Sequence, residues 1–128
     1  MSRRTRMPLV VLVVSMLMVV VAAGAALAAT RYCAGHGNYC YGTANRDTIY
    51  DGPGSDIIQA RAGGDLVRGG YYLYDNDDVY GGKGDDVIRA RDDFDSGYSD
   101  FVSGQRGYDA CYVDYADVVR KCEEVHRG

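Results

Sequence analysis

The chain has 128 residues, 47% of them hydrophobic, and its 14 Lys and Arg against 18 Asp and Glu give a formal net charge of −4. Sixteen of the acids are Asp, a residue that is typical of turns. Binding of nucleic acid calls for a basic face, so this acidic balance argues against that class of partner and favours cations.

The first 28 residues have the pattern of a secretory signal peptide. Three arginines stand within the first six residues, an apolar run follows over residues 9–23, and the Ala-Leu-Ala sequence at 26–28 resembles a cleavage site. We therefore expect residues 1–28 to be removed and the protein to be secreted to the extracellular space. The alternative is a retained membrane anchor, because residues 9–29 carry no charge and are long enough to span a bilayer.

The cysteines lie near the two ends of the predicted mature chain, as Cys33 and Cys40 before the central region and Cys111 and Cys122 after it. Four cysteines in a secreted chain indicate two disulfides, for which three pairings are possible. Pairing of sequence neighbours would close two short loops and staple the ends of the fold. A zinc site is the weaker alternative, because the two pairs lie far apart and neither has CxxC spacing.

Between the cysteine pairs, an aspartate recurs with a nine-residue period that survives two short insertions. Two residues after each aspartate comes an apolar side chain. The seven acid–apolar pairs are Asp47/Ile49, Asp56/Ile58, Asp65/Val67, Asp77/Val79, Asp86/Ile88, Asp100/Val102 and Asp109/Cys111. A fixed short period indicates one structural unit that is stacked on copies of itself.

Each unit divides into a glycine-rich turn and a strand of three residues whose central, apolar side chain is expected to face inward. The predicted fold is therefore all-β, a parallel β-roll of about seven nonapeptide units over residues 42–112 with disulfide-stapled ends. Residues 29–41 and 113–128 are expected to cap it, since exposed strand edges promote aggregation. Within the last segment, Val118, Cys122 and Val125 have helical spacing, whereas residues 117–119 resemble one more strand.

The cleanest unit, residues 81–89, reads Gly-Gly-Lys-Gly-Asp-Asp-Val-Ile-Arg. It resembles the hemolysin-type nonapeptide repeat of the repeats-in-toxin (RTX) family, G-G-x-G-x-D-x-U-x, at every defined position. The resemblance extends over residues 42–112 and implies a β-roll in which calcium lies between stacked turns, held by aspartates and turn carbonyls. The large toxins of this family carry a carboxyl-terminal secretion signal, so this chain resembles a small, separately secreted relative.

The physical chemistry of stacked aspartates also favours a cation. Alternate units stack with turns roughly 5 Å apart, and two carboxylates at ~5 Å repel by ~3 kcal/mol at an effective dielectric constant of ~20. A hard divalent cation with oxygen ligands removes this repulsion, and an acidic ligand set with few thiolates favours Ca²⁺ over zinc or copper. We expect folding to be coupled to calcium, with the pairs Asp65/Asp86 and Asp86/Asp109 as the best sites. The candidate metal ligands are Asp47, Asp56, Asp65, Asp77, Asp86, Asp100 and Asp109.

The alternative is a metal-free solenoid that is stabilised by disulfides and recognises a cell surface or a glycan. Several turns carry arginine where the motif has small residues, and an arginine could neutralise a neighbouring aspartate in place of a metal. These arginines are Arg46, Arg61, Arg91 and Arg106.

The outward ninth positions of alternate units are Tyr50, Arg68, Arg89 and Tyr112. They are expected to form a column on one sheet, which is either ordinary sheet surface or a docking face for a glycan or an acidic cell-surface polymer. Catalysis finds little support, because both histidines lie outside the repeats and the evenly spaced acids resemble repeat ligands rather than an acid–base pair. The predicted partners are therefore calcium ions and a surface polymer, and no enzyme activity is expected.

Overall fold

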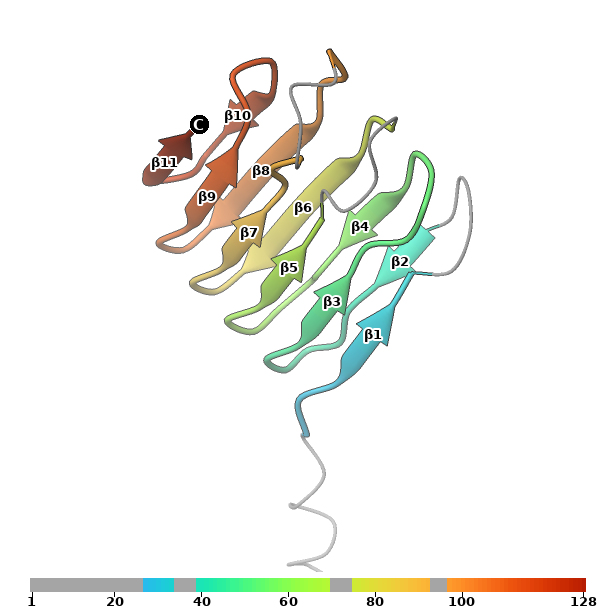
Figure 1. The fold of residues 1–128 in the computed structure, drawn as a ribbon. Coiled ribbons are helices and arrows are strands. Elements are labelled where there is room, and N and C mark those ends of the chain that lie inside the picture. Colours follow the sequence, from blue (N-terminus) through green and yellow to red (C-terminus); the bar gives the residue numbers. More distant parts are fainter. Residues whose placement is uncertain (1–26, 34–38, 70–74, 93–96) are drawn as a thin grey trace, which may run out of the picture.

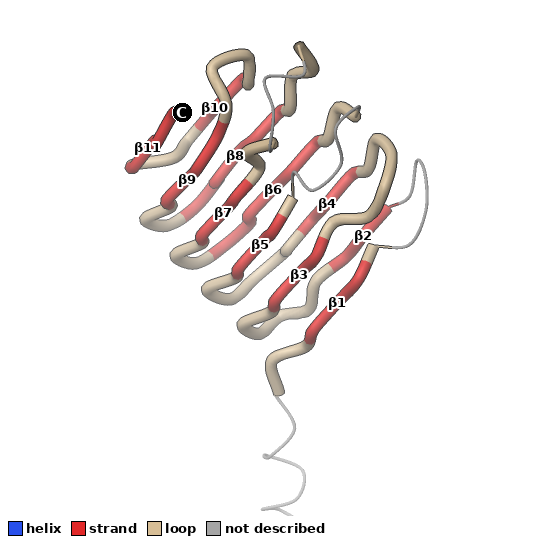
Figure 2. Tube along the Cα trace, in the orientation of Figure 1, coloured by secondary structure: helices blue, strands red, loops and turns tan. Residues whose placement is uncertain are grey.

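The computed structural model describes residues 27–33, 39–69, 75–92 and 97–128. Within these residues the chain forms short strands and turns, and no helix (Figures 1 and 2). The strands are β1 (Thr30–Tyr32), β2 (Tyr39–Tyr41), β3 (Thr48–Tyr50), β4 (Ile57–Gln59), β5 (Leu66–Arg68), β6 (Asp78–Lys83), β7 (Val87–Arg89), β8 (Phe101–Arg106), β9 (Ala110–Val113), β10 (Val118–Arg120) and β11 (Glu124–Arg127).

The strands form two parallel sheets, and the chain passes from one sheet to the other after every strand. Sheet A has the order β1-β3-β5-β7-β9-β11, and sheet B has the order β10-β8-β6-β4-β2. Two successive strands therefore make one coil, and the coils stack along one axis (Figure 1). The predicted all-β, parallel β-roll is confirmed.

The core lies between the two sheets and consists mainly of the central residues of the strands other than the exposed end strands β1 and β11. Ile49, Val67 and Ile88 stand in register on sheet A and have 0% exposure. Side chains of sheet B complete the core with the same exposure, namely Ile58, Val79 and Val102. Burying one such side chain contributes ~1.5–3 kcal/mol. The inward eighth position of the repeat is thus the main apolar contribution to stability.

The two ends of the roll carry the disulfides. Cys33 pairs with Cys40 at a Cα–Cα distance of 5.5 Å, and Cys111 pairs with Cys122 at 6.1 Å. Of the three possible pairings, the structure has the one between sequence neighbours. At the carboxyl end, residues 118–120 and 124–127 form strands β10 and β11, so the tail follows the strand pattern and not the helical spacing.

Nothing in the described part of the chain forms a helix with the length and apolar character needed to cross a membrane. Residues 1–26, which hold nearly all of the predicted signal peptide, lie outside the described residues, as do residues 70–74 and 93–96 of the two expanded units.

The turns require glycine where neighbouring coils approach each other. Gly84 has φ 121°, and a Cβ there would collide with the carbonyl oxygen of Gly63 in the next coil. We expect Gly84→Ala to lower the free energy of unfolding by about 3 kcal/mol, because it combines backbone strain with a steric clash. Urea unfolding in calcium-containing buffer measures this loss.

Gly97 offers the matched control, since it has φ 74° but nothing within 4 Å of an added Cβ. Gly97→Ala should cost only about 1 kcal/mol, the strain of the left-handed conformation alone. Equal losses for the two variants would show that close coil-to-coil approach at Gly84 does not limit stability.

Candidate metal centre

The predicted aspartates form two rows, one along each edge of the roll. Each stands just before a strand, so the parallel register of the strands brings the acids of alternate units together. We call them the longer ladder, Asp47, Asp65, Asp86 and Asp109, and the shorter ladder, Asp56, Asp77 and Asp100. All seven are buried, with 0–3% exposure.

Within each ladder, a carboxylate accepts a hydrogen bond from the backbone N–H of the aspartate in the neighbouring coil. In the longer ladder the N–H of Asp47 donates to Oδ1 of Asp65 (2.7 Å), that of Asp65 to Asp86 (2.8 Å), and that of Asp86 to Asp109 (2.9 Å). The shorter ladder repeats this pattern from Asp56 to Asp77 (2.8 Å) and from Asp77 to Asp100 (2.9 Å). One oxygen of each acceptor therefore ties two coils together.

The second carboxylate oxygen is what makes the longer ladder a candidate cation site. Oδ2 of Asp65, Asp86 and Asp109 is buried without a hydrogen-bond partner. A buried anionic oxygen without a donor is costly and calls for a counter-ion or a proton. In the described residues no arginine lies within salt-bridge distance of these three acids.

The surroundings of these oxygens fit a hard cation. A Cβ on Gly81 would collide with Oδ2 of Asp86, and one on Gly104 would collide with Oδ2 of Asp109, so the first glycine of the repeat keeps this space open. The carbonyl oxygens of Gly104 and Lys121, which belong to the neighbouring coils, lie beside the same two spaces. Carboxylate and carbonyl oxygens of adjacent coils are the donor set that calcium takes in proteins.

The electrostatics of the apo roll oppose ionisation of the ladder. Burial raises the pKa of Asp65 to about 6, of Asp86 to about 7 and of Asp100 to about 8, and the charges of adjacent ladder members add to the rise. Asp47 differs. Burial raises its pKa, but hydrogen bonds from Thr43 and Ala29, together with the charge of Arg31, outweigh burial and lower the pKa. Asp86 in the longer ladder and Asp100 in the shorter ladder therefore have the greatest need for a cation.

We expect the calcium-free protein to lose stability as the pH rises from about 4 to about 8. The folded-state pKa values of Asp65, Asp86 and Asp100 lie above the ordinary 3.8, so the folded state binds more protons across this interval. The stabilisation is complete below about pH 4 and is lost as these carboxyls ionise in the folded state. Urea unfolding at several pH values, after calcium is removed on a chelating resin, measures the slope. A flat profile would contradict the raised pKa values.

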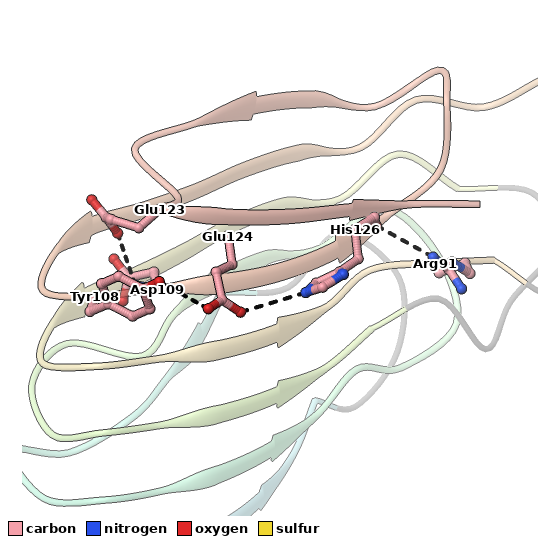
Figure 3. Close-up of polar contacts among 6 residues, drawn as sticks. All are labelled: Arg91, Tyr108, Asp109, Glu123, Glu124 and His126. Carbon is pink, nitrogen blue, oxygen red and sulfur yellow. Dashed lines mark hydrogen bonds and ion pairs between the residues drawn. The ribbon is translucent and has the colours of Figure 1, made fainter.

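Both ladders continue past the predicted residues at the carboxyl end. The N–H of Asp109 donates to Oε2 of Glu123 (2.8 Å), and the N–H of Asp100 donates to Oδ1 of Asp117 (2.9 Å). Figure 3 shows the first of these contacts, beside the hydrogen bond from Tyr108 to Glu124 (2.9 Å). Sequence reasoning missed both acids as ladder members, although each is followed two residues later by an apolar residue, Val125 after Glu123 and Val119 after Asp117.

A further cluster on the shorter ladder was also missed. Asp51, Asp75 and Asp77 each offer an oxygen within 4.8 Å of the others, a group that could hold a metal ion. Burial, followed by the charge of Asp77, raises the pKa of Asp51 to about 9. Two ionised carboxylates supply no donor to each other, so a proton or a cation stabilises this cluster. The sequence pattern did not indicate Asp51 as a ligand, because it stands at the first position of its unit, where the motif has glycine.

Comparison with known proteins agrees with this geometry. The model of the RTX calcium-binding nonapeptide repeat matches residues 41–70 and 73–96, with four copies. No curated protein and no solved structure matches the chain significantly. The matched residues contain Asp47, Asp56, Asp65, Asp77 and Asp86 of the two ladders. The stacked coils, the acid ladders and this match together show that the chain contains RTX calcium-binding nonapeptide repeats, and RTX nonapeptide repeats bind calcium ions.

Proposed function

We propose that the protein is a secreted, calcium-binding structural module whose folding is coupled to calcium. The observation that carries the proposal is the set of unpaired, buried Oδ2 atoms of Asp65, Asp86 and Asp109 within an RTX roll. Calcium would be held by these carboxylates and by neighbouring turn carbonyls. When bound, it supplies positive charge between coils, while the Oδ1 hydrogen bonds of the chain set their spacing.

Secretion is supported by two features of the chain. The first 28 residues have the pattern of a cleaved signal, and the two disulfides belong to an oxidising compartment. Expression of the full chain in a secreting host tests this. Mass spectrometry of protein purified from the medium should give a chain that begins at Ala29. Retention of the intact chain in the membrane fraction would instead support an anchor.

Calorimetric titration of the secreted protein with CaCl₂ tests the binding itself. We expect saturable binding with Kd of about 10⁻⁴–10⁻³ M, the range of extracellular calcium modules. MgCl₂ is the matched control and should bind more weakly, because Mg²⁺ gives up its waters reluctantly and demands octahedral geometry. If no heat of calcium binding is detected at millimolar CaCl₂, the proposed function is contradicted.

A second candidate function, adhesion, is favoured by the outer face of sheet A. Tyr32 stacks on Tyr50 (4.9 Å between ring centroids), and Tyr112 stacks on His126 (4.5 Å). Arg68 and Arg89 lie over Tyr50 and Tyr112 at 5.8 and 5.1 Å. These six residues form one continuous column of rings and guanidinium groups, longer at both ends than the four predicted. A rigid column with two cations suits an extended acidic polymer.

The double variant Arg68→Ser with Arg89→Ser tests adhesion. It should weaken binding of the folded protein to an acidic polysaccharide in a pull-down, because both cations of the column are lost. Arg46→Ser with Arg120→Ser removes the same charge from exposed positions outside this column and serves as the control. Unchanged binding by the first variant would eliminate this face as the adhesive surface.

A further inference from the structure

A pocket of about 230 Å³ lies on the outer face of sheet B, on the opposite sheet from the tyrosine–arginine column. Its lining residues come from three neighbouring strands, β4, β6 and β8, and from the turn after β4. They are Gln59, Arg61, Tyr80, Gly82 and Gln105. This set offers one cation, two amides and one aromatic ring, and it includes no carboxylate.

Two of these lining residues have a strained backbone conformation. Arg61 has φ 79° and Gln105 has φ 80°, the left-handed region that favours glycine. Both occupy the second position of their repeat unit, where the motif has glycine and where Gly82, in the coil between them, has φ 109°. Strain of this kind persists at functional sites. Here it places two long polar side chains on either side of a bare glycine.

The walls of the pocket are positioned by neighbouring rings. The guanidinium of Arg61 lies 4.8 Å from the ring centroid of Tyr41, and the ring of Tyr80 lies 5.7 Å from that of Phe101. Because these contacts already restrict the side chains, less side-chain conformational entropy is lost when a ligand binds. Arg61 has no salt-bridge partner in the described part of the chain, so its charge is available.

Basic residues adjoin the pocket although the whole chain is acidic. Lys83 and Arg106 follow two lining residues directly, pair in register between β6 and β8, and are exposed. Asp78 is an acid on the same face of β6. It precedes Tyr80 in the strand and is therefore farther from Gly82 than Tyr80 is. An anionic ligand is therefore favoured at this place over a neutral or cationic one.

We propose that this pocket binds one carboxylate-bearing sugar ring, such as a uronic acid unit of an acidic polysaccharide. The Arg61 guanidinium matches a carboxylate with two parallel hydrogen bonds. The amides of Gln59 and Gln105 both donate and accept, as ring hydroxyl groups require. Tyr80 supplies an apolar face for the carbon side of the ring. The proposal extends the adhesive role suggested above to a second surface and requires a folded roll.

The test is a titration of the calcium-saturated, secreted protein with methyl β-D-glucuronide, followed by NMR of the glutamine and tyrosine side chains. The neutral methyl β-D-glucoside and acetate are titrated in parallel. We expect the glucuronide to bind more tightly than either, because only it uses Arg61 and the amide–tyrosine walls together. Arg61→Gly should weaken glucuronide binding by about 10-fold or more, since a charge-assisted bidentate contact is lost.

Arg61→Gly and Gln105→Gly restore the glycine of the motif, so both should keep or raise the melting temperature and keep calcium binding. Loss of sugar binding in these variants therefore cannot be assigned to unfolding or to loss of calcium. Arg46→Gly removes the same charge from an exposed turn outside the pocket and should leave the affinity unchanged. The proposal is overturned if Arg61→Gly binds glucuronide normally, if acetate binds as tightly as glucuronide, or if no binding occurs while calcium titrates normally.

Discussion

Chelation of calcium should lower the melting temperature of the protein by about 10–20 °C with both disulfides intact. One ion at ~100 times its Kd raises the free energy of unfolding by ~2.7 kcal/mol. A change of 1 kcal/mol moves the melting temperature of a domain of this size by ~4–8 °C. The loss follows because the buried Oδ2 atoms of Asp65, Asp86 and Asp109 are left without a counter-charge.

Circular dichroism at pH 8, with calcium and after addition of EGTA, measures this effect. Magnesium at the calcium concentration is the control and should restore little of the lost stability. A strand signal and melting temperature that persist in EGTA would favour the metal-free solenoid, in which the disulfides and the ladder hydrogen bonds are sufficient.

Replacement of Asp86 by Asn is expected to change the calcium-bound and calcium-free states in opposite directions. Asp86 is central in the longer ladder, and Oδ1 accepts the N–H of Asp65 (2.8 Å), a bond that an amide oxygen retains. Without the negative charge, repulsion from Asp65 and Asp109 disappears, and the calcium-free protein should gain about 1–3 kcal/mol at pH 8. Calcium affinity should fall by about 100-fold. Asp86 lies between two adjacent candidate sites, and both of them lose a charged ligand.

Two comparisons isolate the ladder charge. Asp78→Asn removes a carboxylate from the outer face of sheet B and should change either quantity by less than about 0.5 kcal/mol. The gain in the calcium-free state should also shrink as the pH falls and vanish below about pH 4, where the Asp86 carboxyl is protonated in both the folded and the unfolded protein. Asp86→Asn with unchanged calcium affinity would exclude Asp86 as a ligand.

The sequence by itself determined the parallel roll, the inward residues and the two rows of acids. In a solenoid the period decides which residues become neighbours, so a local pattern predicts contacts that are distant in the sequence. Asp65 and Asp86 are 21 residues apart, Asp86 and Asp109 are 23, and yet the same N–H to carboxylate bond joins both pairs. The insertions did not disturb this register because the strands that pair lie outside them.

Tertiary structure alone decided the pairing of the cysteines, the ladder ends at Asp117 and Glu123, and the cluster around Asp51. It also revealed the pocket between Arg61 and Gln105. These features depend on backbone conformation and on contacts at positions where the chain departs from its own repeat. In the sequence, Arg61 is only a departure from the motif, which has glycine at this position. In the folded roll it becomes the wall of a pocket, because the coil that completes that pocket lies 44 residues further along the chain.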